Sequence, residues 1–396
     1  MPRLRSEPVL AALMALAALY AWALFVSTFV KPGSIGPNFN APGTDWMVFH
    51  AAARATLDGH IAGIFDGDKF TAFLNGQYKN WLTSPLPFRP WVYPPSFLLL
   101  VLPFGMMGFF TAYLLFQAIT GGALVAALRA GELKAGTIAA VLLSPAAAIS
   151  VIDGQLAFMI AAILAGGFFL LERRPWIAGA ILGLLTLKPQ FALMAPLALI
   201  AGGSWRAFAA ATLSATVLVL ASALALGIEP WIWWWHQTLS SIASPDPKWI
   251  EFGRIWGNSV YACAMLLGAD NKMASLLQAI AVVVCAGVVI AAYRSRMHRD
   301  LKLAVLLVAT ILAAPHSGAY DALLLVIAGF LWIPRTAGET WRWMIVLALW
   351  IVPIISPPAV IPPGRVIPFL LIALIAIVFA EHFSVARKLP REMPVS

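Results

Sequence analysis

Side chains capable of chemistry are rare in this sequence, and they occur in short groups. A carboxylate at Asp45 could accept a proton, and cations such as Lys188 and Arg89 could stabilise negative charge. Ionisable residues are costly to bury in an apolar chain, so they mark candidate functional sites. The other candidates can donate or accept hydrogen bonds, and they are Tyr93, Gln155, Gln190, His236, Arg254, Asn258, His316, Tyr320 and Asp321.

Several of these residues also have a purely structural explanation. Asp45 could be only the N-cap of a helix, where a carboxylate accepts backbone N–H groups. Lys188 lies in an apolar run and could extend its ammonium group to the membrane interface. The sequence Asp153-Gly154-Gln155 is typical of a tight turn. His316 and Asp321 could be helix caps, although such a pair is rarely structural in a membrane.

The composition shows which solvent surrounds most of the chain. Hydrophobic residues make up 61% of the 396 residues and charged residues only 11%, whereas soluble domains have about 45–50% and about 25%. The mean hydropathy is +0.87. These values exclude a soluble cytosolic enzyme and an extended disordered chain. We therefore expect an all-α, polytopic integral membrane protein.

About twelve apolar segments could cross a bilayer as helices, each of which needs roughly 17–25 residues. Several are shorter, and prolines at their edges predict broken or tilted helices. Their expected ranges are 9–30, 94–117, 136–151, 156–171, 176–187, 190–204, 207–227, 274–293, 302–314, 319–334, 341–355 and 366–384.

The segments form one membrane domain over residues 1–396. It divides into a first helix at 9–30, an outer loop at 31–92, helices within 93–227, a second outer loop at 228–273, helices within 274–384 and a tail at 385–396.

The first outer loop contains two stretches with helical spacing, near residues 45–58 and 66–80. In the first stretch, an apolar stripe of Trp46, Phe49, Ala53 and Leu57 predicts a helix that lies in the membrane interface. The second outer loop carries a tryptophan run within residues 231–235. That run could be an interfacial belt or a platform on which a sugar stacks.

The basic residues indicate the orientation. If the N-terminus is cytoplasmic and the segments alternate, 16 of the 26 basic residues and 7 of the 17 acidic residues face the cytoplasm. The whole net charge of +9 then lies on that side, as the positive-inside rule expects. Both termini are cytoplasmic in this topology, and the polar candidates converge on the opposite, outer face. The basic charge is therefore explained by the membrane topology, and we expect no nucleic-acid partner.

Metal and disulfide chemistry have no clear signal. The two cysteines, Cys263 and Cys285, lack the spacing of a zinc site and are expected to fill apolar space. The six histidines include no pair spaced by three residues, so we expect no metal site and no cofactor.

Six short motifs in chain order resemble glycosyltransferase family 87. The first is Asp45, and the other five are Tyr93-Pro94-Pro95-Ser96-Phe97, Asp153-Gly154-Gln155, Lys188-Pro189-Gln190, Trp256-Gly257-Asn258-Ser259-Val260 and Ala314-Pro315-His316 with Tyr320-Asp321. The resemblance extends from about residue 40 to 325. The family contains bacterial enzymes of the GT-C fold class, some of the phosphatidylinositol mannosyltransferase type.

The resemblance implies a function in the bacterial inner membrane. It implies inverting transfer of a hexose or pentose from a polyprenyl-phosphate sugar to a lipid or glycan acceptor at the periplasmic face, with membrane lipids around the chain. Asp45 would be the general base. Lys188, Arg89, Arg254 and His316 could then stabilise the leaving phosphate, and Tyr93, Gln155, Gln190, His236, Asn258, Tyr320 and Asp321 could bind sugar or acceptor. Asp45 is followed by Trp46 rather than a second acidic residue, which favours a site without a divalent metal.

Two other classes compete with this interpretation. A flippase or transporter of lipid-linked sugars would use charges at mid-depth and usually shows an internal repeat, and this sequence has neither. A membrane acyltransferase could use His316 and Asp321 but would leave Asp45 and Lys188 without a role.

Overall fold

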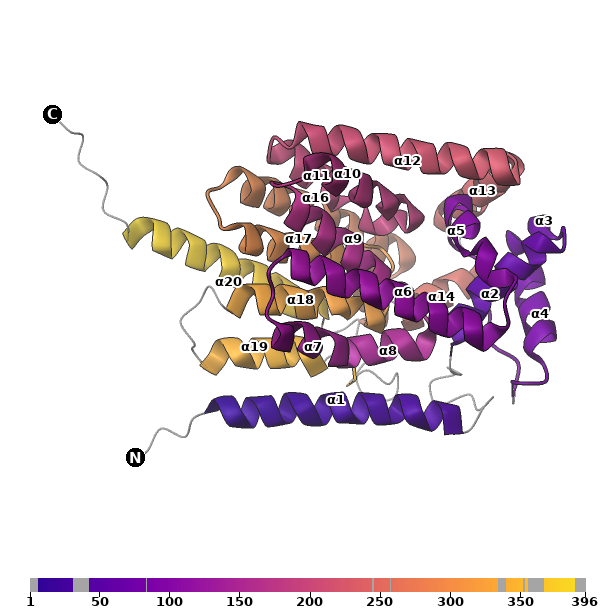
Figure 1. The fold of residues 1–396 in the computed structure, drawn as a ribbon, viewed down its shortest axis with the longest axis horizontal. Helices are drawn as coiled ribbons and strands as arrows, with labels where there is room; N and C mark the ends of the chain where they lie inside the picture. Colours follow the sequence, from indigo (N-terminus) through magenta and orange to yellow (C-terminus); the bar gives the residue numbers. More distant parts are fainter. Residues whose placement is uncertain are drawn as a thin grey trace.

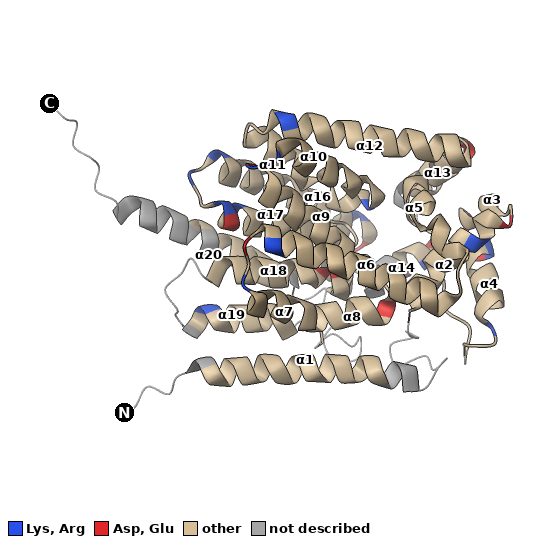
Figure 2. Cartoon of the chain, in the orientation of Figure 1, with Lys and Arg blue, Asp and Glu red and all other residues tan. Residues whose placement is uncertain are grey.

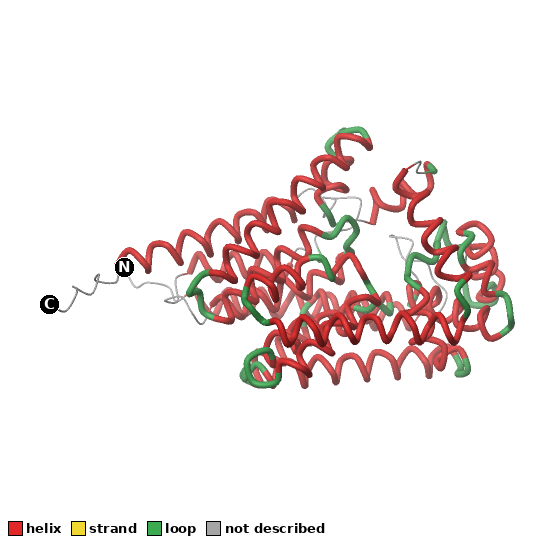
Figure 3. The backbone as a smooth tube through the Cα atoms, turned by 90° about the horizontal axis from the view of Figure 1, so that it is seen from above, coloured by secondary structure: helices red, strands yellow, loops and turns green. Residues whose placement is uncertain are grey.

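The structure, a computed structural model, describes residues 6–30, 43–82, 84–243, 246–256, 258–333, 340–351, 353–354 and 367–388. Over these ranges the chain forms helices joined by loops and contains no strand (Figures 1 and 3). The expected all-α class is therefore confirmed. The part of the first outer loop at residues 31–42 and the tail after residue 388 lie outside the described residues.

Twenty α-helices and three short 3₁₀ helices are assigned in the described chain. They are α1 (Ser6–Val30), α2 (Thr44–Leu57), α3 (Ile61–Ile64), α4 (Gly67–Tyr78), α5 (Pro95–Gly105), α6 (Phe109–Ala130), α7 (Ala135–Leu143), α8 (Pro145–Asp153), α9 (Ala157–Leu170), α10 (Pro175–Gly183), η1 (Leu184–Leu187), η2 (Pro189–Phe191), α11 (Met194–Ala201), α12 (Trp205–Leu226), α13 (Glu229–Ala243), α14 (Pro247–Trp256), α15 (Val260–Leu266), α16 (Asn271–Arg294), α17 (Arg299–Ala313), η3 (Ala319–Ala322), α18 (Leu323–Trp332), α19 (Thr340–Ile351) and α20 (Ile367–Lys388).

Four of the described helices, α1, α6, α12 and α16, are long and apolar enough to cross a membrane on their own. The pair α7 and α8 makes a fifth candidate if it is one span bent by 50°. The bend follows from Ser144 and Pro145, because the Ser144 hydroxyl caps the new helix by accepting from Ala147 N–H at 3.2 Å. The other apolar helices are shorter, so length and composition do not confirm twelve crossings.

One expected crossing is two helices. The segment expected at 94–117 ends a helix at Gly105 and begins the next at Phe109. Gly105 marks a close approach, since a Cβ there would lie 2.8 Å from the Cβ of Ala53 in α2. The chain turns at this contact instead of continuing as one span.

Helices α10 and α12 show how the membrane bundle packs. Gly179 and Gly183, four residues apart in α10, face α12 so closely that a Cβ would lie 2.1 Å and 2.5 Å from the carbonyl oxygens of Ala207 and Ala211. Small residues at this spacing let two helix backbones approach in a membrane. The Ser214 hydroxyl adds a 2.8 Å hydrogen bond to the Ala180 carbonyl.

The apolar stripe of helix α2 packs mainly against protein, although Leu57 at its end is 46% exposed. Trp46, Phe49 and Ala53 are at most 1% exposed, and almost every residue between Thr44 and Ala55 is buried. Helices α5, α4 and α6 cover it. The alanines at 51–53 have small side chains, so other helices pack closely around α2 and cover the first three residues of the stripe.

The second outer loop is largely helical. Helices α13 and α14 occupy residues that were expected to form a loop, and α15 follows them. In Figure 1, α13 and α14 lie at the same end of the bundle as α2, α3 and α4. The two outer segments therefore form one helical region at that end.

The described ends of the chain lie at the opposite end of the bundle. Helix α1 begins there and α20 extends away from it, at the left of Figure 1. The ends of α6, α12, α17 and α19 that carry basic residues also point that way, as Figure 2 shows.

Candidate active site

Asp45 is held at the beginning of α2 by a residue far away in sequence. Gln155 Nε2 donates a 2.5 Å hydrogen bond to Asp45 Oδ2. The residue before the helix is Gly43, which has φ +68° and whose N–H donates to the Ile152 carbonyl at 2.5 Å. Asp45 therefore lies inside the first turn, and its carboxylate accepts from a side chain, so the N-cap interpretation is wrong.

The turn that carries Gln155 is built around a glycine. Gly154 ends α8 with φ +74°, as expected for a tight turn. A Cβ at Gly154 would lie 2.4 Å from the Cβ of Trp46, so no larger side chain fits. This close contact brings Gln155, the residue after Gly154, next to Asp45, the residue before Trp46.

Aromatic and polar contacts fix α2 on its other sides. The Trp46 ring packs against Phe116, with ring centres 4.9 Å apart, and against Phe104 at 5.6 Å. His50 Nε2 donates to the Met107 carbonyl at 3.0 Å, which leaves Nδ1 to accept from the Tyr78 hydroxyl at 2.7 Å. The His50 contacts join α2 to α4 and to the turn between α5 and α6.

Lys188 and Asp321 form a buried ion pair. Lys188 Nζ lies 3.0 Å and 3.3 Å from the two carboxylate oxygens of Asp321, and the side chains are 3% and 2% exposed. The ammonium group also lies over the Phe191 ring at 4.5 Å. Asp321 accepts a further 2.8 Å hydrogen bond from Gly318 N–H. Lys188 therefore does not extend to the membrane interface.

Tyr93 and Tyr320 connect the two halves of this cluster. The charges of Asp45 and Asp321 both act on the Tyr93 hydroxyl, and Gln155 lies within hydrogen-bonding reach of it. Burial, together with both carboxylates, raises the pKa of Tyr93, so its hydroxyl stays protonated and able to donate. The Tyr320 ring lies 5.2 Å from Lys188 Nζ, and the charges of Asp45 and Asp321 act on its hydroxyl.

His316 lies in the loop between α17 and η3 and contributes no positive charge at neutral pH. Burial, with a smaller effect of Lys188, lowers the pKa of His316 to about 4. The prediction that His316 is a cation for the leaving phosphate is therefore not supported by its surroundings. At neutral pH its imidazole can instead donate one hydrogen bond and accept another.

Asn258 joins the cluster through the backbone. Its N–H donates to the Ser317 carbonyl at 2.6 Å, between His316 and Gly318. The Asn258 side chain is 3% exposed, and neither its oxygen nor its nitrogen has a hydrogen-bond partner among the described residues. A buried amide in this state can bind a polar ligand.

Asp153 is a further carboxylate that the sequence analysis did not include among the site residues. It is 7% exposed and interacts electrostatically with Asp45 and with Arg89, which is itself buried. The signal was its position two residues before Gln155. Asp45, Asp153 and Asp321 thus share one region with the cations Arg89 and Lys188.

Three predicted residues do not take part in these contacts. Gln190 is half-buried in η2, two residues after Lys188. His236 is exposed on α13 and lines a separate cavity at the outer-loop end. The side chain of Arg254 lies outside the described residues.

The cluster offers the groups that transfer of a polar substrate requires. Asp45 is half-buried, and its carboxylate could accept a proton. The buried cations can stabilise developing negative charge, and Tyr93 and Asn258 can hydrogen-bond to hydroxyls. Among the described residues, no three His, Cys, Asp or Glu side chains are arranged to hold a metal ion.

Comparison with known proteins identifies the family. The family model for glycosyltransferase family 87 matches residues 91–315. No curated protein and no solved structure matches the chain. Asp45 and Asp321 lie outside the matched range, but both contact residues within it, Gln155 and Lys188. Because the match covers more than half of the chain, the protein belongs to glycosyltransferase family 87 and is a membrane glycosyltransferase.

Proposed function

We propose that this enzyme transfers a hexose or pentose from a polyprenyl-phosphate donor to a lipid or glycan acceptor, with inversion at the anomeric carbon. The observation that carries the proposal is the half-buried Asp45, whose carboxylate Gln155 holds beside a buried polar cluster. The acceptor oxygen attacks the anomeric carbon while Asp45 takes its proton. The bond between the sugar and the phosphate oxygen breaks, and its electron pair leaves with polyprenyl phosphate.

Asp45 is the general base of this reaction. A positioned base contributes about 10²–10⁴-fold to a rate. Gln155 donates to Oδ2 and so fixes the plane of the carboxylate, leaving Oδ1 for the acceptor hydroxyl. Gln155 is a positioning residue in this scheme, because it acts through Asp45.

Lys188 stabilises the leaving phosphate. Its ammonium group has three hydrogens, and Asp321 oxygens lie at 3.0 Å and 3.3 Å, so one hydrogen remains for a phosphate oxygen. The ion pair keeps Lys188 oriented, and both side chains are almost fully buried. Arg89 is the second cation of the cluster, and neutral His316 serves as a hydrogen-bonding group.

The sugar and acceptor hydroxyls bind to amides and phenols of the cluster. Asn258 is the strongest candidate, because its buried amide has no partner among the described residues. Tyr93 and Tyr320 add hydroxyls that interact electrostatically with Asp45. These groups can donate hydrogen bonds to sugar hydroxyls or accept them.

The reaction takes place at the periplasmic face of the bacterial inner membrane, with both termini in the cytoplasm. The charge distribution in the sequence supports this orientation. Helix α1 begins, and α20 ends, on the side of the bundle away from α2, which carries Asp45. This arrangement agrees with the proposed orientation.

The test is donor turnover by the purified full chain in lipid vesicles. Labelled polyprenyl-phosphate hexoses and pentoses are offered with a lipid and glycan extract of a bacterial envelope as acceptor. We expect one donor to release polyprenyl phosphate while its label enters a new product, and labelled sugar nucleotides to give no product. Movement of an intact donor across the bilayer without release of phosphate would show a flippase instead.

A further inference from the structure

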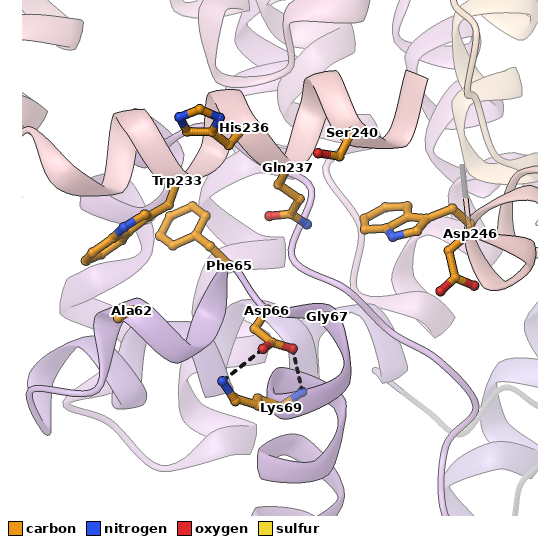
Figure 4. A pocket seen from close by; sticks show the side chains of 11 residues that line it. Ala62, Phe65, Asp66, Gly67, Lys69, Trp233, His236, Gln237, Ser240 and Asp246 are labelled. Atoms are coloured by element: carbon orange, nitrogen blue, oxygen red, sulfur yellow. Dashed lines mark hydrogen bonds and ion pairs between the residues drawn. The ribbon is translucent and has the colours of Figure 1, made fainter. Parts of the chain in front are cut away.

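A cavity of about 500 Å³ lies between the two outer helical segments. Helices α3 and α4 form one wall, and α13 and α14 form the other (Figure 4). Its volume is within the range of small-molecule sites. The lining residues used below are Phe65, Asp66, Trp233, Gln237, Ser240 and Trp249.

The cavity is distinct from the Asp45 cluster but is connected to it. Gln237 Nε2 donates to the Trp91 carbonyl at 2.8 Å, and Trp234 Nε1 donates to the Val92 carbonyl at 3.3 Å. The next residue along the chain is Tyr93, which interacts with Asp45. One wall of the cavity is therefore bonded to the segment that enters the candidate active site.

The walls combine aromatic faces with neutral hydrogen-bonding groups. Phe65 and Trp233 lie with ring centres 6.0 Å apart, and Trp249 contributes a further indole. Gln237 extends from α13 toward the turn that carries Asp66 (Figure 4). Its Oε1 has no hydrogen-bond partner among the described residues and could accept one from a ligand hydroxyl.

The charges on the walls do not favour an anionic ligand. Lys69 contributes an ammonium group, and it is paired with Asp66 at 3.1 Å. Asp246 adds a second carboxylate, so the ionised lining groups have a net negative charge when His236 is neutral. A phosphate or sulfate would meet this charge, whereas a ligand with many hydroxyls would not.

We infer that this cavity binds a neutral saccharide, the sugar portion of the acceptor, and presents it to the Asp45 site. Aromatic rings stack against the C–H faces of a sugar ring, while Gln237, Ser240 and the carboxylates hydrogen-bond to its hydroxyls. The role as acceptor site rests on the proposed function. The saccharide site itself does not depend on it.

The experiment measures saccharide binding by the purified full chain without donor. The probes are a set of neutral oligosaccharides built from common hexoses and pentoses, and the same compounds carrying a phosphate. We expect at least one neutral compound to bind. Ser240→Trp, which fills the cavity from α13, should weaken that binding at least about tenfold.

Matched variants separate the cavity from general damage. Leu239→Trp places the same ring on the neighbouring, exposed position of α13, which does not line the cavity, and should bind as the wild type does. Trp249→Ala should weaken binding about tenfold, whereas Trp249→Phe keeps an aromatic face and should restore most of it. Thermal midpoints confirm that each variant is folded.

Each outcome decides one of the two proposals. If no neutral saccharide binds, if only phosphorylated ones bind, or if Ser240→Trp binds like the wild type, the saccharide site is wrong whatever the transfer activity. If a neutral saccharide binds through the cavity but no donor is ever consumed, the site stands and the proposed transfer is wrong. Asp45→Asn should still bind the saccharide, because Asp45 does not line the cavity.

Discussion

The Asp45 carboxylate and the Gln155 amide, 110 residues apart in the chain, are joined by a 2.5 Å hydrogen bond. The bond connects the first turn of α2 to the turn that ends α8. Gln155 lies within the residues that match the family and Asp45 lies before them. Thus α2 carries the carboxylate, and the turn after α8 carries the amide that orients it.

Asp45→Asn should abolish most sugar transfer while the fold and donor binding survive. Asparagine has nearly the same shape, and its Oδ1 can still accept from Gln155, but the amide cannot take a proton. We expect the transfer rate to fall about 10²-fold or more, with the thermal midpoint and donor-lipid affinity nearly unchanged. The measurements are labelled-sugar transfer, thermal unfolding and donor-lipid binding.

Asp58→Asn is the matched control, because Asp58 is exposed at the other end of α2. It should transfer sugar at the wild-type rate. Wild-type activity in Asp45→Asn would instead move the search for the base to Asp153 or Asp321.

Gln155→Ala should lower turnover without removing any group that touches the substrate in our scheme. The Asp45 carboxylate would lose the bond that fixes its plane, and misplacement of about 1 Å can cost about 10²-fold. We expect kcat to fall about 10- to 100-fold with little change in KM for the donor. Gln117→Ala is the comparison, since Gln117 donates to the Gln155 backbone carbonyl at 3.3 Å and not to its side chain, as far as the described residues show. Equal losses in both variants would indicate general disruption of the α8 turn.

The sequence was sufficient to predict the fold class, several helices, a turn and the family. The class, the helices near 45–58 and 66–80 and the turn at Gly154 agree with the structure because each depends on local periodicity or a local breaker. The family was identified from six short motifs and is confirmed. Local patterns suffice for such features.

The partners of the charged residues could not be predicted in the same way. Nothing near Lys188 in sequence indicates Asp321, 133 residues later, and Asp153 looked like a turn residue only. The protein contacts of α2 could not be predicted either, because an apolar stripe has the same pattern whether lipid or protein covers it. Such features are set by tertiary packing.

His316 should make stability depend on pH. Burial lowers the pKa of His316 from the model-compound value of 6.5 to about 4, so the unfolded chain binds a proton in this interval and the native chain does not. The contribution of neutral, buried His316 to folding stability is complete above pH 6.5 and is lost as the pH falls toward 4. The thermal midpoint of the wild type should therefore fall more steeply over that interval than the midpoint of His316→Gln. Parallel curves for the two proteins would contradict the assigned burial.

Gly154→Ala should disturb both the fold and the site. A left-handed backbone conformation costs a residue with a Cβ about 1–2 kcal/mol, and the new Cβ would also meet the Trp46 Cβ at 2.4 Å. We expect a loss of stability above that cost and reduced transfer, because Asp45 precedes Trp46 and Gln155 follows Gly154. Thermal unfolding and sugar transfer measure the two effects.

Gly59→Ala provides the control for the backbone cost alone. Gly59 has φ +79°, close to that of Gly154, and a Cβ there would meet nothing within 4 Å. Its substitution should cost only the conformational part and leave transfer unchanged. Equal effects at both glycines would show that the contact with Trp46 relaxes easily.

Variants of the Lys188–Asp321 pair should separate its contribution to stability from its contribution to catalysis. Lys188→Ala leaves the Asp321 carboxylate buried without its cation, which should cost about 3–5 kcal/mol. The double variant Lys188→Met/Asp321→Asn removes both charges and keeps an oxygen for Gly318 N–H, so most of the stability should return. Lys248→Ala breaks an ion pair with Asp68 that is 51% and 67% exposed, and it should cost less than about 1 kcal/mol.

Transfer activity in the double variant then shows what the ammonium group does. If Lys188 donates to the leaving phosphate, the refolded double variant should remain about 10- to 100-fold slower, because a hydrogen bond to a charged group contributes about 1.5–3 kcal/mol. Lys188→Arg, with the charge kept, should lose less transfer than Lys188→Ala. Full recovery of both stability and transfer in Lys188→Met/Asp321→Asn would mean that the pair only holds η3 against η2, and that Arg89 is left as the cation that meets the phosphate.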